Sequence, residues 1–370
     1  MKYQRMPIEV ESPEEMGYEN IKYNLAESSV RDRKMSELNA NLEDLVLNYG
    51  DHRGLIELRN LISEDSKILK ANQVLVCQAA AMSLFIVNTS ILSANDHLIV
   101  IRPNYATNIE TPKAISCEIS YIDLSFESSF QIDIEQIKKS IQKNTKLISI
   151  TTPHNPTGIV FKDEIINNLI ELAEEKGIYL LIDETYRELN FQSKLKPYYA
   201  EKSKKVISIS SLSKAYGLPG LRIGWIIIRD EALYYLFLAA KEQIIITNSV
   251  VDEYLALCAI KTKEKLLAES NIHLKANFEI TKNWLVFHPN LEWIEPEVGA
   301  IGFVRFKNTI NIDFSKFYEI LYDQHQTIVG PGHWFEQSDR YFRLGFGYPT
   351  SAELIEGLMA IDNTINNLID

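Results

Sequence analysis

The chain has 370 residues, a formal net charge of −12, and a composition that is 46% hydrophobic and 24% charged. These values predict a folded protein with room for two domains. The acidic balance and the lack of a basic block argue against nucleic-acid binding. We expect no signal peptide, no membrane association and a cytoplasmic location, because the sequence has no apolar run of the required length. Three scattered cysteines indicate free thiols, and the seven histidines lack metal-ligand spacing, which argues against a metal site.

Strands and helices are predicted to alternate over residues 41–280. Apolar runs predict strands at 74–76, 97–101, 118–122, 146–150, 178–182, 206–209 and 223–228. A helix is expected at 163–176, where apolar residues recur at helical spacing before Gly177. This alternation predicts an α/β domain of three layers, with a mostly parallel sheet buried between helices.

The rest of the chain predicts a smaller α+β domain. A long helical stretch is expected to run through Trp284, followed by short strands near Trp293 and at 303–306. Two further helices are expected, at 314–324 and from Ala352 onward. Residues 1–40 contain too little pattern to fold alone, so we expect them to pack onto this domain. The predicted division is a large domain at 41–280 and a small domain formed by 1–40 and 281–370.

Polar segments follow three of the predicted strands in the large domain. They carry Asn155 in an Asn-Pro-Thr-Gly turn, Asp183 with Tyr186, and Lys214 between hydroxyl residues and glycines. Because ligands bind beyond the carboxyl ends of the strands in open α/β sheets, we expect these side chains to meet at one site. A lysine amine at such a site can form a Schiff base with a carbonyl compound. The plainer interpretations are a turn former, a core tyrosine and a surface lysine.

With these segments in this order and spacing, nearly the whole chain resembles the pyridoxal-phosphate enzymes of fold type I, in particular the class I and II aminotransferase family. The resemblance implies pyridoxal 5′-phosphate as cofactor and an L-amino acid as substrate. Lys214 would carry the aldimine and then move the proton of the substrate Cα. Asp183 would face the pyridine nitrogen and keep it protonated. Tyr186 and Asn155 would hydrogen-bond the phenolic oxygen, and Tyr105 would stack on the ring.

The resemblance also implies a site for the cofactor phosphate, made of an arginine, hydroxyls and the first amides of a helix. The matching positions are Ser211 and Arg222, with the backbone amides of Ala79, Ala80 and Ala81, and Ser213 would assist them. The family usually has glycine at the position of Ala79, so the exact geometry is open there.

Two further positions match residues that reach the phosphate of a neighbouring subunit. Tyr49 and Thr247 occupy them. The resemblance therefore implies a homodimer with shared active sites.

On the substrate side, Arg343 matches the arginine that binds the α-carboxylate, since a guanidinium pairs with a carboxylate in a bidentate manner. The backbone at Ala26 matches the segment that lies over the substrate, with Asn155 nearby. Gln243 stands where aspartate-type members have an arginine for the second carboxylate. We therefore expect an aminotransferase that is not specific for aspartate.

Acidic residues lie in and before the segment that is expected to cover the substrate. Glu27, Glu9 and Glu11 would favour a cationic side chain such as a guanidinium, although the plainer interpretation is solvated surface carboxylates. The segments at 28–30 and 330–335 also resemble the subgroup of capreomycidine-synthase-like enzymes. The alternative function is therefore elimination and cyclisation of a hydroxylated arginine to a cyclic guanidine amino acid of the capreomycidine or enduracididine type.

A third hypothesis is a non-catalytic ligand sensor with the same fold, as in transcription regulators with an aminotransferase-like domain. The complete set of cofactor residues, and the expected lack of a DNA-binding segment, argue against it.

Overall fold

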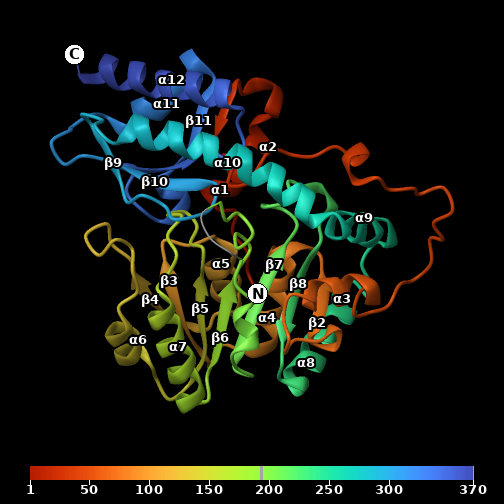
Figure 1. Cartoon of the computed structure of the whole chain (residues 1–370). Helices are drawn as coiled ribbons and strands as arrows, with labels where there is room; N and C mark the ends of the chain where they lie inside the picture. Colours follow the sequence, from red (N-terminus) through yellow and green to blue (C-terminus); the bar gives the residue numbers. More distant parts are fainter. Residues whose placement is uncertain (192–194, 370) are drawn as a thin grey trace.

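The computed structural model describes residues 1–191 and 195–369 (Figure 1). Its larger sheet has seven strands in the order β2-β8-β7-β6-β5-β3-β4. The strands are β2 Val74–Cys77, β3 His97–Arg102, β4 Glu118–Asp123, β5 Thr145–Thr151, β6 Tyr179–Asp183, β7 Val206–Ser211 and β8 Gly224–Ile228. Strand β8 runs antiparallel to both of its neighbours, and the other pairs are parallel. The predicted strands and the mostly parallel sheet are confirmed.

Helices cover both faces of this sheet. Helices α4 (Ala79–Ile91), α5 (Thr107–Ile115) and α8 (Glu231–Ile244) pack on one face, and α6 (Ile134–Ser140) and α7 (Asp163–Lys176) pack on the other. Along β3, Ile99 belongs to the apolar cluster of α7, whereas Leu98 belongs to that of α4. Because successive side chains of a strand point to opposite faces, a strand that is apolar throughout is buried from both sides. The predicted three-layer α/β architecture is confirmed.

A second, five-stranded sheet has the order β1-β11-β12-β10-β9. Its strands are β1 Tyr23–Leu25, β9 Leu291–Trp293, β10 Ile301–Phe306, β11 Thr327–Pro331 and β12 Tyr341–Gly345. Helices α10 (Lys263–Leu285), α11 (Phe314–His325) and α12 (Ser351–Ile369) pack around it (Figure 1). Strand β1 pairs in parallel with β11, so the N-terminal segment joins this sheet, as expected.

The long helical stretch that was predicted to run through Trp284 is two helices. Helix α9 comprises Val250–Lys261 and is followed by Thr262, whose φ of −110° and ψ of 18° are not helical. Helix α10 begins directly after Thr262. Helix α9 packs on α3 (Ile56–Ser63), whereas α10 continues to the second sheet and crosses residue 280. The division at residues 40 and 280 stays a prediction.

Two short helices precede β1 in the N-terminal segment. They are α1 (Pro7–Val10) and α2 (Pro13–Met16), and α1 contacts the turn at Gly332–Phe335. No helix in the described residues is long and apolar enough to cross a bilayer.

Candidate active site

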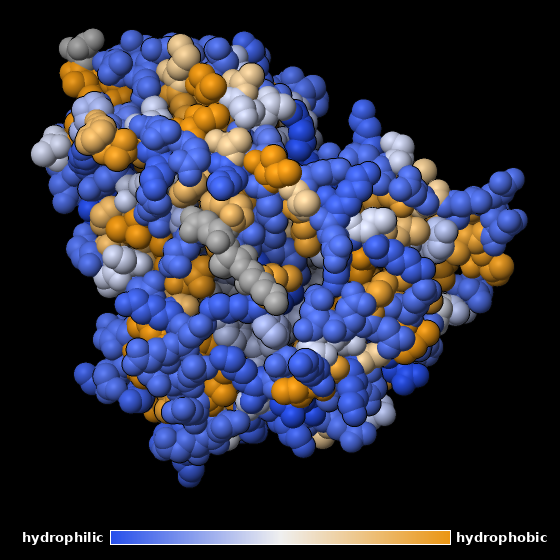
Figure 2. All heavy atoms as spheres, viewed as in Figure 1, coloured by the Kyte–Doolittle hydropathy of each residue, from blue (hydrophilic) through white to orange (hydrophobic). Residues whose placement is uncertain are grey.

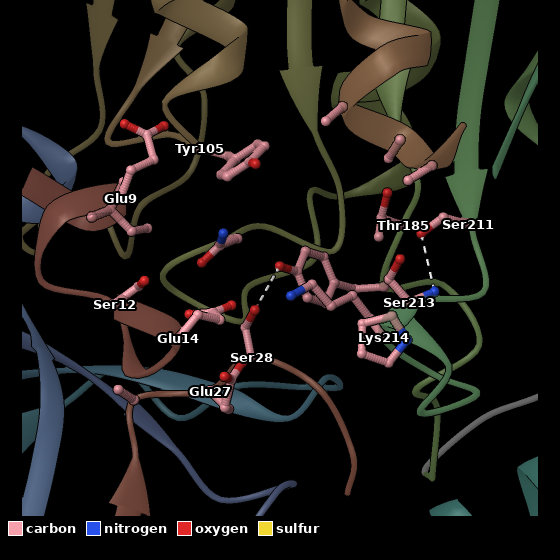
Figure 3. Close-up of a pocket in the computed structure, with 18 of the residues that line it drawn as sticks. Glu9, Ser12, Glu14, Glu27, Ser28, Tyr105, Thr185, Ser211, Ser213 and Lys214 are labelled. Atoms are coloured by element: carbon pink, nitrogen blue, oxygen red, sulfur yellow. Dashed lines mark hydrogen bonds between the residues drawn. The ribbon is translucent and has the colours of Figure 1, made fainter. Parts of the chain in front are cut away.

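A cavity of about 440 Å³ lies at the carboxyl ends of β5, β6 and β7, between the two sheets (Figure 3). Strand topology brings these ends together, as expected for an open α/β sheet. Most of the predicted site residues line the cavity: Ala26, Glu27, Ala79, Ala80, Ala81, Tyr105, Asn155, Asp183, Tyr186, Ser211, Ser213, Lys214, Arg222 and Arg343.

Lys214 and Asp183 face this cavity from neighbouring strands. Lys214 is half-buried in the loop after β7, and Asp183, which ends β6, is 4% exposed. Oδ1 of Asp183 accepts hydrogen bonds from the amide and the hydroxyl of Thr185, at 3.0 and 2.6 Å. Burial raises the pKa of Asp183, although the bonds from Thr185 and the charge of Lys214 oppose the rise. A cationic partner at this carboxylate would therefore stabilise its charged form.

Tyr186 presents a protonated phenol to the same cavity. Burial raises its pKa to about 12, although Arg343 and the hydroxyl of Ser28 oppose the rise. Its phenolic oxygen lies 3.1 Å from Oγ of Ser28. Sequence analysis assigned no role to Ser28, because only the fold brings it close to Tyr186. It also assigned none to Thr185, although Thr185 lies only two residues from Asp183.

The opposite end of the cavity is suited to an anion. The first residues of α4 lie beside Ser211, and Arg222 comes directly after the short helical turn Pro219–Leu221. Gly224 permits this arrangement, because a Cβ there would come within 2.6 Å of the Ala79 backbone. Ala79 has a φ of 62°, in the left-handed region that favours glycine and costs an alanine roughly 1–2 kcal/mol. The alanine thus keeps a glycine-like backbone, and the first residues of α4 line the cavity, where their amides would be available to an anion.

Arg343, from β12, is a buried cation without an anionic partner. Its side chain is 5% exposed, and burial lowers its pKa. Nε and Nη2 donate to the carbonyl oxygen of Ala26 at 3.2 and 2.6 Å, and Nη1 donates to Oδ1 of Asn155 at 3.1 Å. Both acceptors are neutral, and no carboxylate among the described residues forms an ion pair with this guanidinium. A buried, unpaired charge is costly unless a ligand compensates it.

The N-terminal segment forms an acidic wall opposite Lys214 (Figure 3). Glu9 from α1, Glu14 from α2 and Glu27 after β1 line the cavity. Within the described residues none of the three forms an ion pair; Glu27 accepts only the hydroxyl of Tyr18, at 3.4 Å. Sequence analysis missed Glu14, since nothing in its local pattern separates it from a surface carboxylate.

Glu11 does not face the cavity, contrary to the expectation that grouped it with Glu9. Its Oε2 accepts from the indole of Trp334 and contacts the ring of His333, both at 2.7 Å. Burial lowers the pKa of His333, but its hydrogen bonds with Glu11 and Asp339 outweigh this effect and raise it. Glu11 therefore anchors the N-terminal segment rather than lining the site.

Three predicted positions lie away from this cavity. Tyr49 is 80% exposed, Gln243 is exposed and Thr247 is partly buried. For Tyr49 and Thr247 the resemblance implied contact with a second subunit, and in aspartate-type members the arginine at the position of Gln243 acts across subunits. Their roles stay predictions.

The sequence of this chain is similar to those of known proteins. Residues 20–361 match the sequence model of the family "Aminotransferase class I and II". The chain is 30% identical, over 86% of each sequence, to a probable aspartate aminotransferase of Methanocaldococcus jannaschii. It is 25% identical to the capreomycidine synthase of Streptomyces vinaceus, over 94% of this chain and 91% of that one.

Solved structures share the fold. A PLP-dependent aminotransferase from Streptococcus suis superposes with a TM-score of 0.91 at 28% identity, covering 100% of this chain and 99% of that one. The PLP-dependent cyclase OrfR superposes with a TM-score of 0.88 at 21% identity, covering 99% and 98%.

Proposed function

This chain belongs to the class I and II aminotransferase family, and we propose that it transfers the amino group of an L-amino acid and is not specific for aspartate. The chain is a PLP-dependent enzyme, as the family is. One observation carries the proposal: Arg343, a buried cation with no anionic partner among residues 1–191 and 195–369, lines the same cavity as the amine of Lys214. An α-amino acid fits these two residues, because its carboxylate would pair with the guanidinium and its amine would take the place of the Lys214 amine at a bound aldehyde.

The residues of the cavity fit the cofactor. Asp183 offers a buried carboxylate to the pyridine nitrogen, and Tyr186 offers a phenol to the phenolic oxygen. Ser211, Arg222 and the first amides of α4 form the anion site that the phosphate requires. When bound, the cofactor supplies an aldehyde that condenses with an amine and a ring that accepts electrons from the substrate Cα.

Two residues of the chain then act on the substrate. Arg343 binds the α-carboxylate, which would replace the neutral oxygens of Ala26 and Asn155 as acceptors. This pairing orients the Cα–H bond, because two parallel hydrogen bonds leave the carboxylate little rotational freedom. Nζ of Lys214 would remove the Cα proton as a general base and deliver it to C4′ of the bound cofactor as a general acid.

We further propose a homodimer. Val46, Leu47 and Tyr49 are 70%, 75% and 80% exposed, in the segment that extends from the body of the molecule. Figure 2 shows apolar side chains gathered at the end of this projection. Apolar side chains in such a position favour burial against another chain. A second copy would cover them and bring Tyr49 toward a neighbouring active site.

An alternative reaction is favoured by the acidic wall of the site. Glu9, Glu14 and Glu27 complement a cationic side chain such as a guanidinium. A relative that covers most of the chain is a capreomycidine synthase. The alternative is that a β-hydroxylated arginine loses water across Cα and Cβ and that a guanidino nitrogen then adds to Cβ, so that the amino group stays on the product.

Replacement of Lys214 tests the common part of both functions. Lys214→Ala should abolish turnover and the absorbance of the lysine-bound cofactor together, whereas retained turnover would contradict the proposal. The two reactions are separated by incubating the cofactor-loaded enzyme with 3-hydroxyarginine. A cyclic guanidine product without any keto acid supports the alternative, and a strict requirement for a keto acid supports amino-group transfer.

A further inference from the structure

Ser28 touches the site at the phenol of Tyr186. Its side chain is 2% exposed and lines the cavity, and its Oγ lies 3.1 Å from the phenolic oxygen (Figure 3). Ser28 comes from the segment after β1, in the smaller sheet, whereas Tyr186 follows β6 in the larger one. The contact therefore joins the two halves of the site.

The segment that carries Ser28 is held on both sides. Before it, the carbonyl oxygen of Ala26 accepts from Arg343, and after it the amide of Val30 donates to the carbonyl of Lys214 at 3.1 Å. The segment also lies close against β12, because a Cβ on Gly345 would come within 2.0 Å of the backbone oxygen of Glu27. The position of the Ser28 hydroxyl is thus set by backbone contacts.

Two hydroxyls at this distance share one hydrogen bond, and the direction of that bond matters. If the Ser28 hydroxyl donates, the proton of Tyr186 is free to point into the cavity. Since the pKa of Tyr186 is raised to about 12, its phenol is protonated near neutral pH and acts as a donor. A phenol that itself accepts a hydrogen bond is a stronger donor, because hydrogen bonds in a chain polarise one another.

We propose that Ser28 is a positioning residue that donates its hydroxyl proton to Tyr186 and so directs the Tyr186 proton toward the cofactor. This role rests on the proposed function, in which Tyr186 donates to the phenolic oxygen of pyridoxal phosphate. Negative charge on that oxygen is greatest after the neighbouring nitrogen has lost its proton. A donor to the oxygen therefore favours the deprotonated form and lowers the pH at which the absorbance of the cofactor-loaded enzyme changes.

The test is a double-mutant cycle. The measured quantity is the pH midpoint of the absorbance change of the cofactor-loaded enzyme. Ser28→Ala should raise the midpoint by about 0.1–0.7 pH unit, because it removes only the polarisation that strengthens the bond from Tyr186 by roughly 10–30%. Tyr186→Phe should raise it further. In the Tyr186→Phe background, Ser28→Ala should cause no additional rise, since the two residues act through one bond.

Ser29→Ala is the matched control. Ser29 is the next residue and is 3% exposed, but its side chain lies outside the residues that line the cavity. This variant should keep the wild-type midpoint. If Ser28→Ala does not fold, Ser28→Cys supplies a weak donor of similar shape and should shift the midpoint in the same direction by less.

Three outcomes would overturn the proposal: an unchanged midpoint in Ser28→Ala, a lower midpoint, or a rise that persists in full without the Tyr186 hydroxyl. A rise of equal size in Ser29→Ala would also overturn it, because the effect would then reflect local packing. Failure of the proposed amino-group transfer has a separate signature, since the cofactor-loaded wild-type enzyme would then keep its absorbance change with pH but transfer no amino group to a keto acid.

Discussion

The buried guanidinium of Arg343 gives the sharpest prediction about substrate binding. We consider Arg343→Lys, which keeps the positive charge but replaces a planar, two-pronged donor by a single ammonium. In the structure the guanidinium donates from Nε, Nη1 and Nη2, so all of its nitrogens are engaged by oxygen acceptors. An ammonium at the same position can satisfy only part of this arrangement.

The magnitude follows from the number of bonds lost to the ligand. A carboxylate pairs with arginine through two parallel hydrogen bonds and with lysine through one. The loss of one hydrogen bond to a charged group costs about 1.5–3 kcal/mol. This corresponds to a roughly 10- to 150-fold weaker affinity for an amino acid substrate.

The assay compares an amino acid with the amine formed by its decarboxylation. L-Arginine and agmatine are a suitable first pair, titrated against the cofactor-loaded enzyme by absorbance. Arg343→Lys should weaken binding of the amino acid and leave the amine almost unaffected. Arg340→Lys, at a position outside the cavity where the guanidinium donates to backbone oxygens of Phe306 and Lys307, is the control and should alter neither.

An equal loss of affinity for both ligands would refute this reasoning. It would mean that Arg343 acts by holding the carbonyl of Ala26 and thus the covering segment, rather than by binding the α-carboxylate. A wild-type enzyme that binds the amine as tightly as the amino acid would refute it as well.

Other predictions concern specificity, assembly and pH. Glu27→Gln should weaken binding of L-arginine roughly tenfold more than binding of its neutral analogue citrulline, as measured by the same titration. Equal losses for both ligands would show that Glu27 does not recognise the positive charge of the side chain. Leu47→Asp should convert a sedimenting dimer to a monomer, because this side chain is 75% exposed in the single chain and would be buried in the dimer; an unchanged mass would place the interface elsewhere. The raised pKa of His333 means that its contact with Glu11 is fully stabilising below the ordinary value of 6.5 and is lost as pH rises through the higher folded value. Relative to an unstructured control peptide, which corrects for the pH dependence of trypsin itself, cleavage after Arg5 should therefore be faster at pH 9 than at pH 6, and Glu11→Gln should remove this difference.

Much of the site could be predicted from local sequence because its residues stand at the ends of strands. Asp183 ends β6, and Lys214 lies just beyond β7. Apolar runs identify such strands by themselves, since the alternation of side chains is a property of consecutive residues. Helix α7 has the bounds predicted from its periodicity and from the glycine that follows it.

Other features depend on residues that are far apart in the chain. Ser28 and Tyr186 are 158 positions apart, and Glu11 and His333 are 322 apart. No local pattern encodes such contacts, because they form only when the two sheets and the N-terminal segment pack together. The same is true of Ala79, whose left-handed backbone reflects the close approach of α4 to β8.

The sequence by itself thus determined the strand order along the chain, the polar segments that follow the strands and the cofactor to which they point, since these are encoded in neighbouring residues. Only the tertiary structure decided which carboxylates line the cavity, that Glu11 is an anchor, that the helical stretch breaks at Thr262, and that Ser28 contacts Tyr186. The physical reason is that a side chain's partner is set by packing, and packing joins residues whose separation in the sequence carries no signal.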